Sequence, residues 1–384
     1  MIPPLPWPAF AALLLLGLSA SYWLLANRWL KQWMALSEEQ RHLRESLPPV
    51  TFLRPLKRDS PRLEATLEKL VNAMRPDDQL VLGLGADSEA EVICDDLRSR
   101  FPDRDIQAVR CNRSAGLNPK ICKLLQMVPR ARHEHWILSD SEALFDKTFL
   151  EAFRTEWATG GADALTAGYR FIHLDTLPQQ LDAASSLLTL WPGLAVLRRF
   201  GELRLTLGAC TAFRRGDLDA LGGFAALHRD LAEDNRLGRA LALAGRTVRL
   251  STHVVTLLSD AMNWREYWRH QRRVAVTYRV SNPAGFAASI LTHGLSLALA
   301  TAPFLGTTHP LAAWLLVGSA WLVRWFAVRE TARILSFPVP KLAAVVFVGS
   351  LVETVCWGLA WFSRRVWWAG EWRDVSREGK LSPL

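Results

Sequence analysis

Acidic side chains recur at three places in the 384-residue chain where an apolar run gives way to a loop or to the start of a helix. Asp87 follows the apolar run QLVLGLG. Asp140 and Glu142 stand two positions apart in WILSDSEALF, and Glu233 and Asp234 open the helical pattern in DLAEDNRLGRAL. Carboxylates in such positions can bind a cation, accept a hydrogen bond from a nucleotide, or act as a general base.

Asp140 and Glu142 have the spacing of a divalent-cation site. Carboxylates at i and i+2 after a strand can converge on one hard cation, and Mg²⁺ or Mn²⁺ is usually held by one or two carboxylates plus diphosphate oxygens. Taken alone, this pair is better explained as two solvated loop acids, and the acids at Asp87 and Asp234 are equally explained as helix-terminal residues. The three acidic sites in this order are much more specific together.

A basic and aromatic run, NWREYWRHQRRVAVTYR, follows the third acidic site. Its guanidinium groups, among them Arg269 and Arg273, can neutralise a diphosphate leaving group. Its rings, including Trp264 and Trp268, suit either a membrane interface or a sugar. A basic stretch directly before an apolar segment also binds anionic lipid headgroups, so the two explanations are compatible.

The elements that must position these residues alternate between strands and helices. Short apolar runs predict strands over residues 50–56, 79–84, 106–110 and 135–138, and helical patterns lie between them over residues 61–73, 89–100 and 119–126. Such alternation predicts an α/β fold with a mainly parallel sheet, whose carboxyl edge is the place for chemistry. The sequence GLGA beside Asp87 lacks the third glycine of a dinucleotide-binding fingerprint.

The apolar residues concentrate at the two ends of the chain. Residues 1–27 carry no charge and are followed by Arg28 and Lys31, which predicts a transmembrane anchor over residues 1–30 with the following residues on the cytoplasmic side. A cleaved signal peptide is the alternative, but its positive charge would precede the apolar run. Residues 48–280 are then expected to form a cytoplasmic domain, within which the segment 181–200, interrupted by Pro192 and Gly193, is interfacial or re-entrant.

Segments 284–305, 310–328 and 342–362 have the length of membrane spans, so residues 281–363 are predicted to be transmembrane helices and residues 364–384 a basic tail. Arg324 and Glu353 would be costly facing lipid and should face the bundle, the headgroups or a partner. Three spans would carry the basic tail to the far side, against the positive-inside bias. Either one segment is re-entrant or the tail violates that bias.

The composition restricts the partners. The net charge is +9, and the basic residues cluster beside apolar segments, which favours anionic lipid over nucleic acid. The five cysteines form no CxxC pair and show no disulfide-like spacing, which indicates a reducing compartment.

The order of these segments resembles that of the ceramide glucosyltransferases and their bacterial relatives, the hopanoid biosynthesis-associated glycosyltransferases, of the inverting family 2 type. The resemblance covers nearly the whole chain. Its segments are PPVTFLRPLKRDSPRLE, the Asp87 loop, GLNPKICKL, SDSEALF, LGACTAFRRGDLDALGGF, LAEDNRLG and RHQRRVAVTYRVSNPAGF.

The resemblance implies a glycosyltransferase-A-type catalytic domain that transfers a hexose from a UDP-sugar to a hydroxyl of a membrane lipid, at the cytoplasmic face of a bacterial inner membrane. It implies Asp234 as the catalytic base, and Asp140 with Glu142 as ligands of Mg²⁺ or Mn²⁺. The residues that it implies for the nucleotide-sugar are Asp87, Lys120, Asp140, Arg269, His270 and Arg273. It also implies a ceramide or a hopanoid polyol as acceptor.

The chain departs from the family pattern at two places. The second acid of the metal motif is Glu142 where aspartate is usual, and the (Q/R)xxRW motif has His270 at its first position and Val274 at its last. Two other functions are considered beside the lipid transferase. A processive polysaccharide synthase should have more spans and an intact motif, and a non-catalytic membrane scaffold would not need the acids at the three sites.

Overall fold

The computed structural model describes residues 7–39, 47–57, 62–85, 88, 90–112, 117–201, 203–306 and 309–384. The chain forms two compact units. The sheet unit consists of Met34–His173, Gly201–Asp260 and Trp368–Leu384, and the helical unit of Met1–Trp33, Leu174–Phe200 and Ala261–Trp367. The chain therefore passes repeatedly between the two units.

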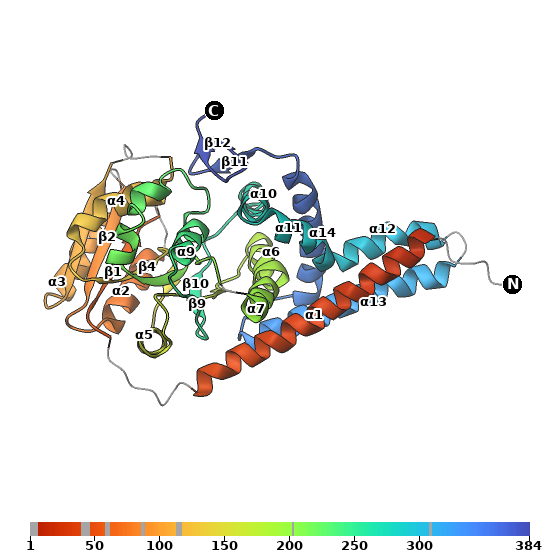
Figure 1. Cartoon of the computed structure of the whole chain (residues 1–384), viewed down its shortest axis with the longest axis horizontal. Helices are drawn as coiled ribbons and strands as arrows, with labels where there is room; N and C mark the ends of the chain where they lie inside the picture. Colours follow the sequence, from red (N-terminus) through yellow and green to blue (C-terminus); the bar gives the residue numbers. More distant parts are fainter. Residues whose placement is uncertain are drawn as a thin grey trace. The chain divides into compact units, whose positions relative to one another are not determined.

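The sheet unit is built on a seven-stranded sheet in the order β3-β2-β1-β4-β8-β6-β9. Strands β1, β2 and β4 of this sheet are labelled in Figure 1. Four neighbouring strands are parallel: β1 (Val50–Pro55), β2 (Gln79–Gly85), β3 (Asp105–Cys111) and β4 (His135–Ser139). The remaining strands are β6 (Ala164–Thr166), β8 (Cys210–Arg214) and β9 (Val248–Leu250). Strand β8 runs antiparallel to both β4 and β6, so the parallel order ends beside β4.

Helices flank this sheet and connect its strands. They are α2 (Leu63–Ala73), α3 (Ala90–Arg100), α4 (Pro119–Met127), α5 (Lys147–Thr159), α8 (Arg215–Asp219) and α9 (Glu233–Leu243). A second sheet contains β5 (Ala143–Leu144), β10 (Val255–Leu258) and β7 (Tyr169–Ile172). Strands β12 (Glu371–Val375) and β13 (Leu381–Ser382) form an antiparallel hairpin near the end of the chain, after β11 (Arg365–Trp368).

The expected α/β class is confirmed, and the physical reason is burial on both faces of the sheet. All six residues of β1 are buried, and its apolar side chains share one core with those of β2 and α2. A parallel strand that is covered on both faces reads as a continuous apolar run, which is the signal that predicted β1, β2 and β4. The predicted helix starts at Pro61 and Glu89 lie outside the described residues.

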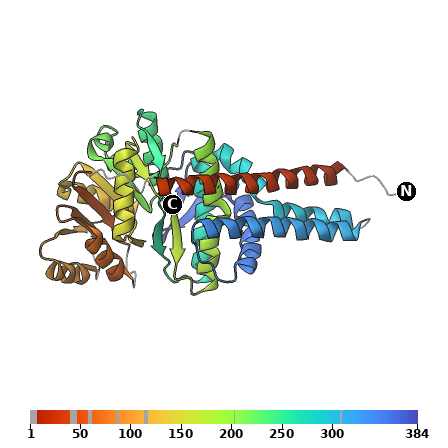
Figure 2. The ribbon, with the colours of Figure 1, turned by 90° about the horizontal axis from the view of Figure 1, so that it is seen from below.

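In the helical unit, α1 (Trp7–Glu39), α12 (Gly294–Gly306) and α13 (Pro310–Ile334) lie side by side (Figures 1 and 2). Leu16 packs against the cluster that joins α12 to α13. Asn27 donates a hydrogen bond from Nδ2 to the carbonyl oxygen of Ala327 at 2.9 Å. Helix α1 therefore runs in the same direction as α13, with Leu16 near the first turns of α13 and Asn27 further along it.

The other helices of this unit are α6 (Leu177–Ser185), α7 (Trp191–Phe200), α10 (Trp264–Ser281), α11 (Pro283–Ala288) and α14 (Leu342–Ala360). The predicted interruption at Pro192 does not end the helical path. A π-turn, Ser186–Leu190, joins α6 to α7, and Pro192 lies in the first turn of α7. The N–H of Trp191, directly before Pro192, bonds to the carbonyl oxygen of Ser186, so the wider π-type turn lies immediately before the proline.

Two helices among the described residues, α13 and α14, are long and apolar enough to cross a bilayer. The segment predicted as a single span over 284–305 is instead bent by 59° between Pro283–Thr292 and Gly294–Gly306, so it is either one broken span or a re-entrant loop. The bend comes at His293, whose backbone leaves the helical region before α12 begins.

Arg324 and Glu353 pair with each other inside the helical unit, which confirms that neither faces lipid alone. Arg324 is 1% exposed and its Nη2 lies 2.7 Å from Oε2 of Glu353. Ser350 accepts from Nε of Arg324 at 2.6 Å, and Thr189 donates to Oε1 of Glu353 at 2.7 Å. These contacts satisfy two buried charges and join α13, α14 and the π-turn.

The units do not follow the domain boundaries expected from composition. The predicted domain 48–280 includes Leu174–Phe200 and the residues from Ala261 onward, which belong to the helical unit. The tail beyond Trp368 belongs to the sheet unit, although the helical segments separate it from that unit in sequence. Apolar composition predicts the helical segments, but it does not predict which of the residues that follow them belong to the sheet unit.

Candidate active site

Four charged residues meet at the carboxyl edge of the parallel strands, all within the sheet unit. Asp140 directly follows β4. Lys120 lies in the first turn of α4, where the side chain of Asn118 accepts hydrogen bonds from the backbone N–H groups of Lys120 and Ile121 at 3.0 and 3.2 Å. The motif GLNPKICKL is thus a helix start, with an asparagine cap and a proline at the first position, that directs Lys120 to this edge.

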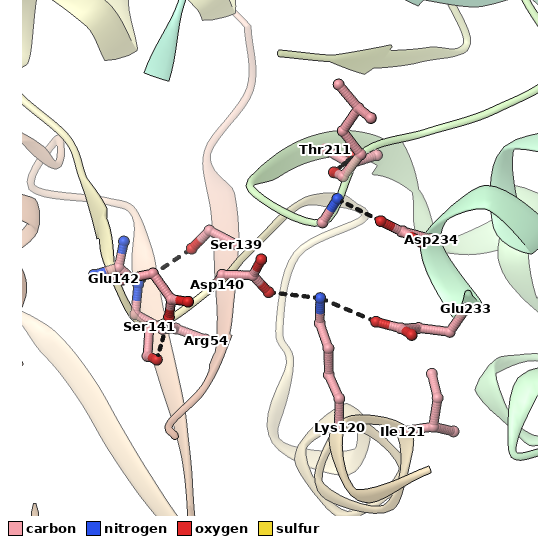
Figure 3. A network of polar contacts seen from close by, with 12 residues as sticks. Arg54, Lys120, Ile121, Ser139, Asp140, Ser141, Glu142, Thr211, Glu233 and Asp234 are labelled. Carbon is pink, nitrogen blue, oxygen red and sulfur yellow. Dashed lines mark hydrogen bonds and ion pairs between the residues drawn. The ribbon is translucent and has the colours of Figure 1, made fainter. Parts of the chain in front are cut away.

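Lys120 lies between carboxylates that come from distant parts of the chain (Figure 3). Its Nζ is 2.7 Å from Oδ1 of Asp140 and 3.2 Å from Oε1 of Glu233. Glu233 and Asp234 are the first two residues of α9, where the helix dipole favours negative charge. One ammonium group therefore joins the end of β4 to the start of α9.

The charges of this group perturb one another. Burial on its own would lower the pKa of Lys120, but the surrounding carboxylates outweigh it and raise that pKa above its ordinary value. Burial and the adjacent Glu233 raise the pKa of Asp234 to about 6, although Lys120 opposes this rise. A carboxyl with a pKa near neutrality can both take up and release a proton under physiological conditions.

Asp234 is also held by the segment before β8. Its Oδ2 accepts a hydrogen bond from the backbone N–H of Gly208 at 2.8 Å, and its carbonyl oxygen accepts one from Oγ1 of Thr206 at 2.6 Å. Gly238, one turn further along α9, lets the helix approach this segment, because a Cβ there would lie 2.2 Å from the carbonyl carbon of Leu205. The glycine in LAEDNRLG therefore serves close packing behind Asp234.

Gly208 lies at the centre of the charged group. A Cβ added there would lie 3.0 Å from Oδ2 of Asp140, 3.2 Å from Nζ of Lys120 and 3.3 Å from Oδ2 of Asp234. These distances are tighter than ordinary van der Waals contacts. The absence of a side chain at Gly208 thus allows the three groups to converge.

Glu142 lies apart from Lys120, on the side of Ser141 and Arg54 (Figure 3). Its Oε2 accepts a hydrogen bond from Oγ of Ser141 at 2.8 Å. Arg54 is fully buried and donates to Oγ of Ser139 at 3.1 Å and to the carbonyl oxygen of Ala143 at 2.7 Å. Arg54 therefore holds the Ser139 side chain on one side of Asp140 and Glu142 and the Ala143 backbone on the other.

The other predicted site residues lie elsewhere. Asp87 is outside the described residues. Arg269, His270 and Arg273 lie on α10 in the helical unit, where the Arg269 guanidinium is 4.0 Å from the ring centroid of Trp367. The structure does not bring these three residues together with Asp140 and Asp234 in one compact unit.

His270 has a carboxylate partner that sequence reasoning missed. Its Nδ1 is 2.6 Å from Oδ1 of Asp182 on α6, and Gln271 donates to the same oxygen at 2.8 Å. Burial on its own would raise the pKa of Asp182, but His270, Gln271 and Arg273 hold it below its ordinary value. The sequence signal for this pair is an aspartate, Asp182, within the apolar stretch LDAASSLL, because a buried carboxylate needs a polar partner.

Sequence reasoning also assigned no role to Arg54, Gly208 or Asn118. Arg54 had a signal of its own, because an arginine inside the apolar strand VTFLRP must find partners when buried. Asn118 before Pro119 indicates a helix start, but nothing in the residues next to Gly208 or Asn118 indicates the distant groups that they contact. Their roles depend on the meeting in space of segments that are distant in sequence, such as Asn118 with Asp230 and Glu233.

The donor chemistry at this edge suits a divalent cation that also binds a diphosphate. Three carboxylates, Asp140, Glu233 and Asp234, share a single ammonium group, so the site favours additional positive charge. In the described part of the chain, no group of three or more His, Cys, Asp or Glu is arranged to hold an ion by protein ligands alone. One or two carboxylates completed by phosphate oxygens are the usual set for Mg²⁺ or Mn²⁺, and these residues fit that set.

A mainly parallel sheet with carboxylates at its carboxyl edge gives this chain a glycosyltransferase-A-type α/β fold, and two of its helices are long and apolar enough to cross a bilayer. The family model described as Glycosyl transferase family 21 matches residues 10–381. The chain belongs to this family and is a glycosyltransferase. The resemblance to the ceramide glucosyltransferases is thereby confirmed at the level of the family.

Solved structures similar to this chain have low sequence identity. The mannosyltransferase PcManGT from Pyrobaculum calidifontis, in complex with GDP-Man and Mn²⁺, is 16% identical with a TM-score of 0.45, over 88% of this chain and 99% of that one. S. aureus TarS 1–349, in complex with UDP-GlcNAc, is 11% identical with a TM-score of 0.38, over 87% of this chain and 98% of that one.

Gly208→Ala is expected to slow sugar transfer by about tenfold or more, because displacement of catalytic groups by a fraction of an ångström is costly to rate. The new methyl group would push Asp140, Lys120 and Asp234 apart. Initial rates in membranes check this, with Gly193→Ala as the matched control, since a Cβ at Gly193 meets nothing within 4 Å. A wild-type rate in Gly208→Ala would show that the convergence is not needed.

Proposed function

We propose that this chain transfers a hexose, glucose or N-acetylglucosamine, from a UDP-sugar to a hydroxyl of a membrane lipid, with inversion at the anomeric carbon. The acceptor is a ceramide or a hopanoid polyol. The observation that carries the proposal is the meeting of Asp140, Lys120 and Asp234 at the carboxyl edge of the sheet in a member of family 21. A site of this kind needs a cation for the diphosphate and a base for the acceptor, and it offers residues for both.

Asp234 is proposed as the base. In this role it removes the proton from the acceptor hydroxyl, and the hydroxyl oxygen then attacks the anomeric carbon while UDP departs. A single displacement of this type inverts the anomeric centre. The hydrogen bond from the Gly208 N–H and the proximity of Lys120 orient the Asp234 carboxylate, which supports a base held in one direction.

Asp140, with Glu142, is proposed to hold Mg²⁺ or Mn²⁺. Such an ion, when bound, neutralises the negative charge that develops on the departing diphosphate. Lys120 keeps the carboxylates of this edge together and supplies a fixed positive charge beside the donor. Asp87, Arg269, His270 and Arg273 are proposed to bind the nucleotide-sugar, on the resemblance alone.

We also propose that α1, the bent pair of Pro283–Thr292 with α12, and α13 cross the membrane and that α14 does not. Because the tail belongs to the sheet unit, the chain between Asp260 and Trp368 must cross an even number of times. Helix α14 is steeply inclined to the other three in both views (Figures 1 and 2). This assignment places Arg28, Arg333 and the basic tail together on the cytoplasmic side, as the positive-inside bias requires.

The proposed reaction is tested by incubating membranes that contain the protein with radiolabelled UDP-glucose or UDP-N-acetylglucosamine and counting label in the extracted lipids. Asp234→Asn is expected to lower incorporation about 10²- to 10⁴-fold, the usual contribution of a general base. Thermal stabilisation of the detergent-solubilised variant by UDP with Mn²⁺ should remain, because a lost base affects the chemical step.

The outcomes separate the alternatives. Label in the organic phase that depends on Asp234 supports the lipid transferase and identifies the donor. Label in an insoluble polymer would instead indicate a polysaccharide synthase. No label from either donor, in membranes supplied with ceramide and hopanoid polyols, together with no stabilisation by UDP, would favour the scaffold. Loss of UDP binding in Asp234→Asn would indicate that Asp234 binds the donor and is not the base.

The transfer rate is expected to rise with pH through about 6, because the Asp234 pKa lies there and only the ionised carboxylate accepts a proton. Lys120→Met should move this midpoint upward, since the Lys120 charge lowers the Asp234 pKa. A pH series of kcat/KM for wild type and Lys120→Met checks both. A midpoint that stays at the same pH in Lys120→Met would contradict the proposed coupling.

The proposed membrane arrangement predicts which positions react with a membrane-impermeant maleimide in intact cells. His309→Cys should react from outside, whereas Pro338→Cys and Arg377→Cys should react only after permeabilisation. The five native cysteines are buried and provide a low background. Reaction of Pro338→Cys from outside would instead make α13 and α14 the crossing pair.

A further inference from the structure

The last residues of the chain bind to the segment that precedes the proposed base. We name residues 376–382 the C-terminal strap. The strap is a tight turn between β12 and β13, closed by hydrogen bonds from the Ser376 N–H to the Lys380 carbonyl at 2.9 Å and from the Gly379 N–H to the Ser376 carbonyl at 3.1 Å. Gly379 has a φ of +79°, which a side chain would disfavour.

The strap is joined to residues 229–231 by backbone hydrogen bonds. The Leu381 N–H donates to the Arg229 carbonyl at 2.7 Å, and the Leu231 N–H donates to the Gly379 carbonyl at 3.0 Å. Asp230 and Lys380 face each other as an antiparallel bridge. Leu381 itself is fully buried, so the strap packs as part of the sheet unit.

An ion pair reinforces this contact. Nζ of Lys380 is 2.8 Å from Oδ2 of Asp230, whose side chain is 4% exposed. A carboxylate with so little contact with water depends on its partner, because an unpaired buried charge is costly. Loss of the Lys380 charge should therefore loosen the backbone around Asp230.

Asp230 is connected in turn to the charged group. Its carbonyl oxygen accepts a hydrogen bond from Nδ2 of Asn118 at 2.9 Å, and the same amide nitrogen is 3.1 Å from Oε2 of Glu233. Asn118 also caps the helix that carries Lys120. Contacts therefore lead from the strap through Asp230 and Asn118 to two places, Lys120 and the first turn of α9.

We propose that the C-terminal strap holds the first turn of α9 in its working position, with Lys380 as a positioning residue for Asp234. This inference rests on the proposed role of Asp234. The strap follows the last apolar helix in sequence, so the site is completed only when the whole chain, including its membrane part, has been made. The basic tail then has a structural role in the site in addition to any attraction to lipid headgroups.

The test compares Lys380→Met with Arg377→Met in the full-length protein. Both substitutions remove one positive charge from the strap, but Arg377 is exposed and does not contact Asp230. Lys380→Met should lower kcat about tenfold or more while changing the donor KM much less, because misplacement of the base affects the chemical step. Lys380→Arg should restore most of the rate, and Arg377→Met should match wild type.

Amide hydrogen exchange of the detergent-solubilised protein provides a readout that does not require activity. In Lys380→Met, exchange should increase in residues 228–236 and stay unchanged in β1, β2 and β4. If exchange in Lys380→Met rises throughout the sheet, that variant is destabilised as a whole, and Asp230→Asn is used in its place as the milder variant. The expected pattern of exchange is the same. Unchanged exchange in residues 228–236 in these variants would overturn the proposal.

The two proposals can fail independently. If the wild-type protein is inactive but Lys380→Met shows faster exchange in residues 228–236, the proposed reaction is contradicted and the proposed role of the strap is supported. If the wild-type protein is active and Lys380→Met changes neither kcat nor exchange, the proposed reaction is supported and the proposed role of the strap is contradicted.

Discussion

The ammonium group of Lys120 is the interaction on which the site depends. Asp140 and Glu233 come from a strand end and a helix start that repel each other electrostatically, and Lys120 lies within 3.2 Å of both. Without a cation between them, like charges this close would push the strand end and the helix start apart. With one ammonium for three carboxylates, the site keeps a negative excess that suits a metal ion and a base with a raised pKa.

Glycines and caps set the geometry around this charge. Gly208 removes the side chain that would separate the three groups, and Gly238 allows α9 to pack directly against the Leu205 backbone. Asn118 satisfies the start of α4 while reaching Asp230 and Glu233. The charged group is thus held by backbone contacts and short polar side chains, which leave little freedom for the carboxylates to move apart.

In the helical unit, buried charges are paired one to one, unlike the excess of carboxylates around Lys120. Arg324 and Glu353 are paired and hydrogen-bonded among apolar side chains, so their role in the fold is to join α13, α14 and the π-turn. His270 and Asp182 form a second polar pair in this unit, at the motif position where the family has glutamine or arginine. A histidine that needs a carboxylate partner explains how this departure is accommodated locally.

The α/β class, the parallel strands from Val50 to Ser139, the acidic sites and the apolar segments could be predicted from the sequence, because each depends on residues that are neighbours along the chain. The sequence did not reveal that Lys120 joins Asp140 to Glu233, that Arg54 holds residues on both sides of Asp140, or that the segment from Pro283 to Gly306 bends. Nor did it show that Lys380 returns to Asp230 across the helical segments. These contacts depend on which distant segments meet in the folded chain, whereas hydrophobic periodicity predicts the buried face of an element and not the element that covers it.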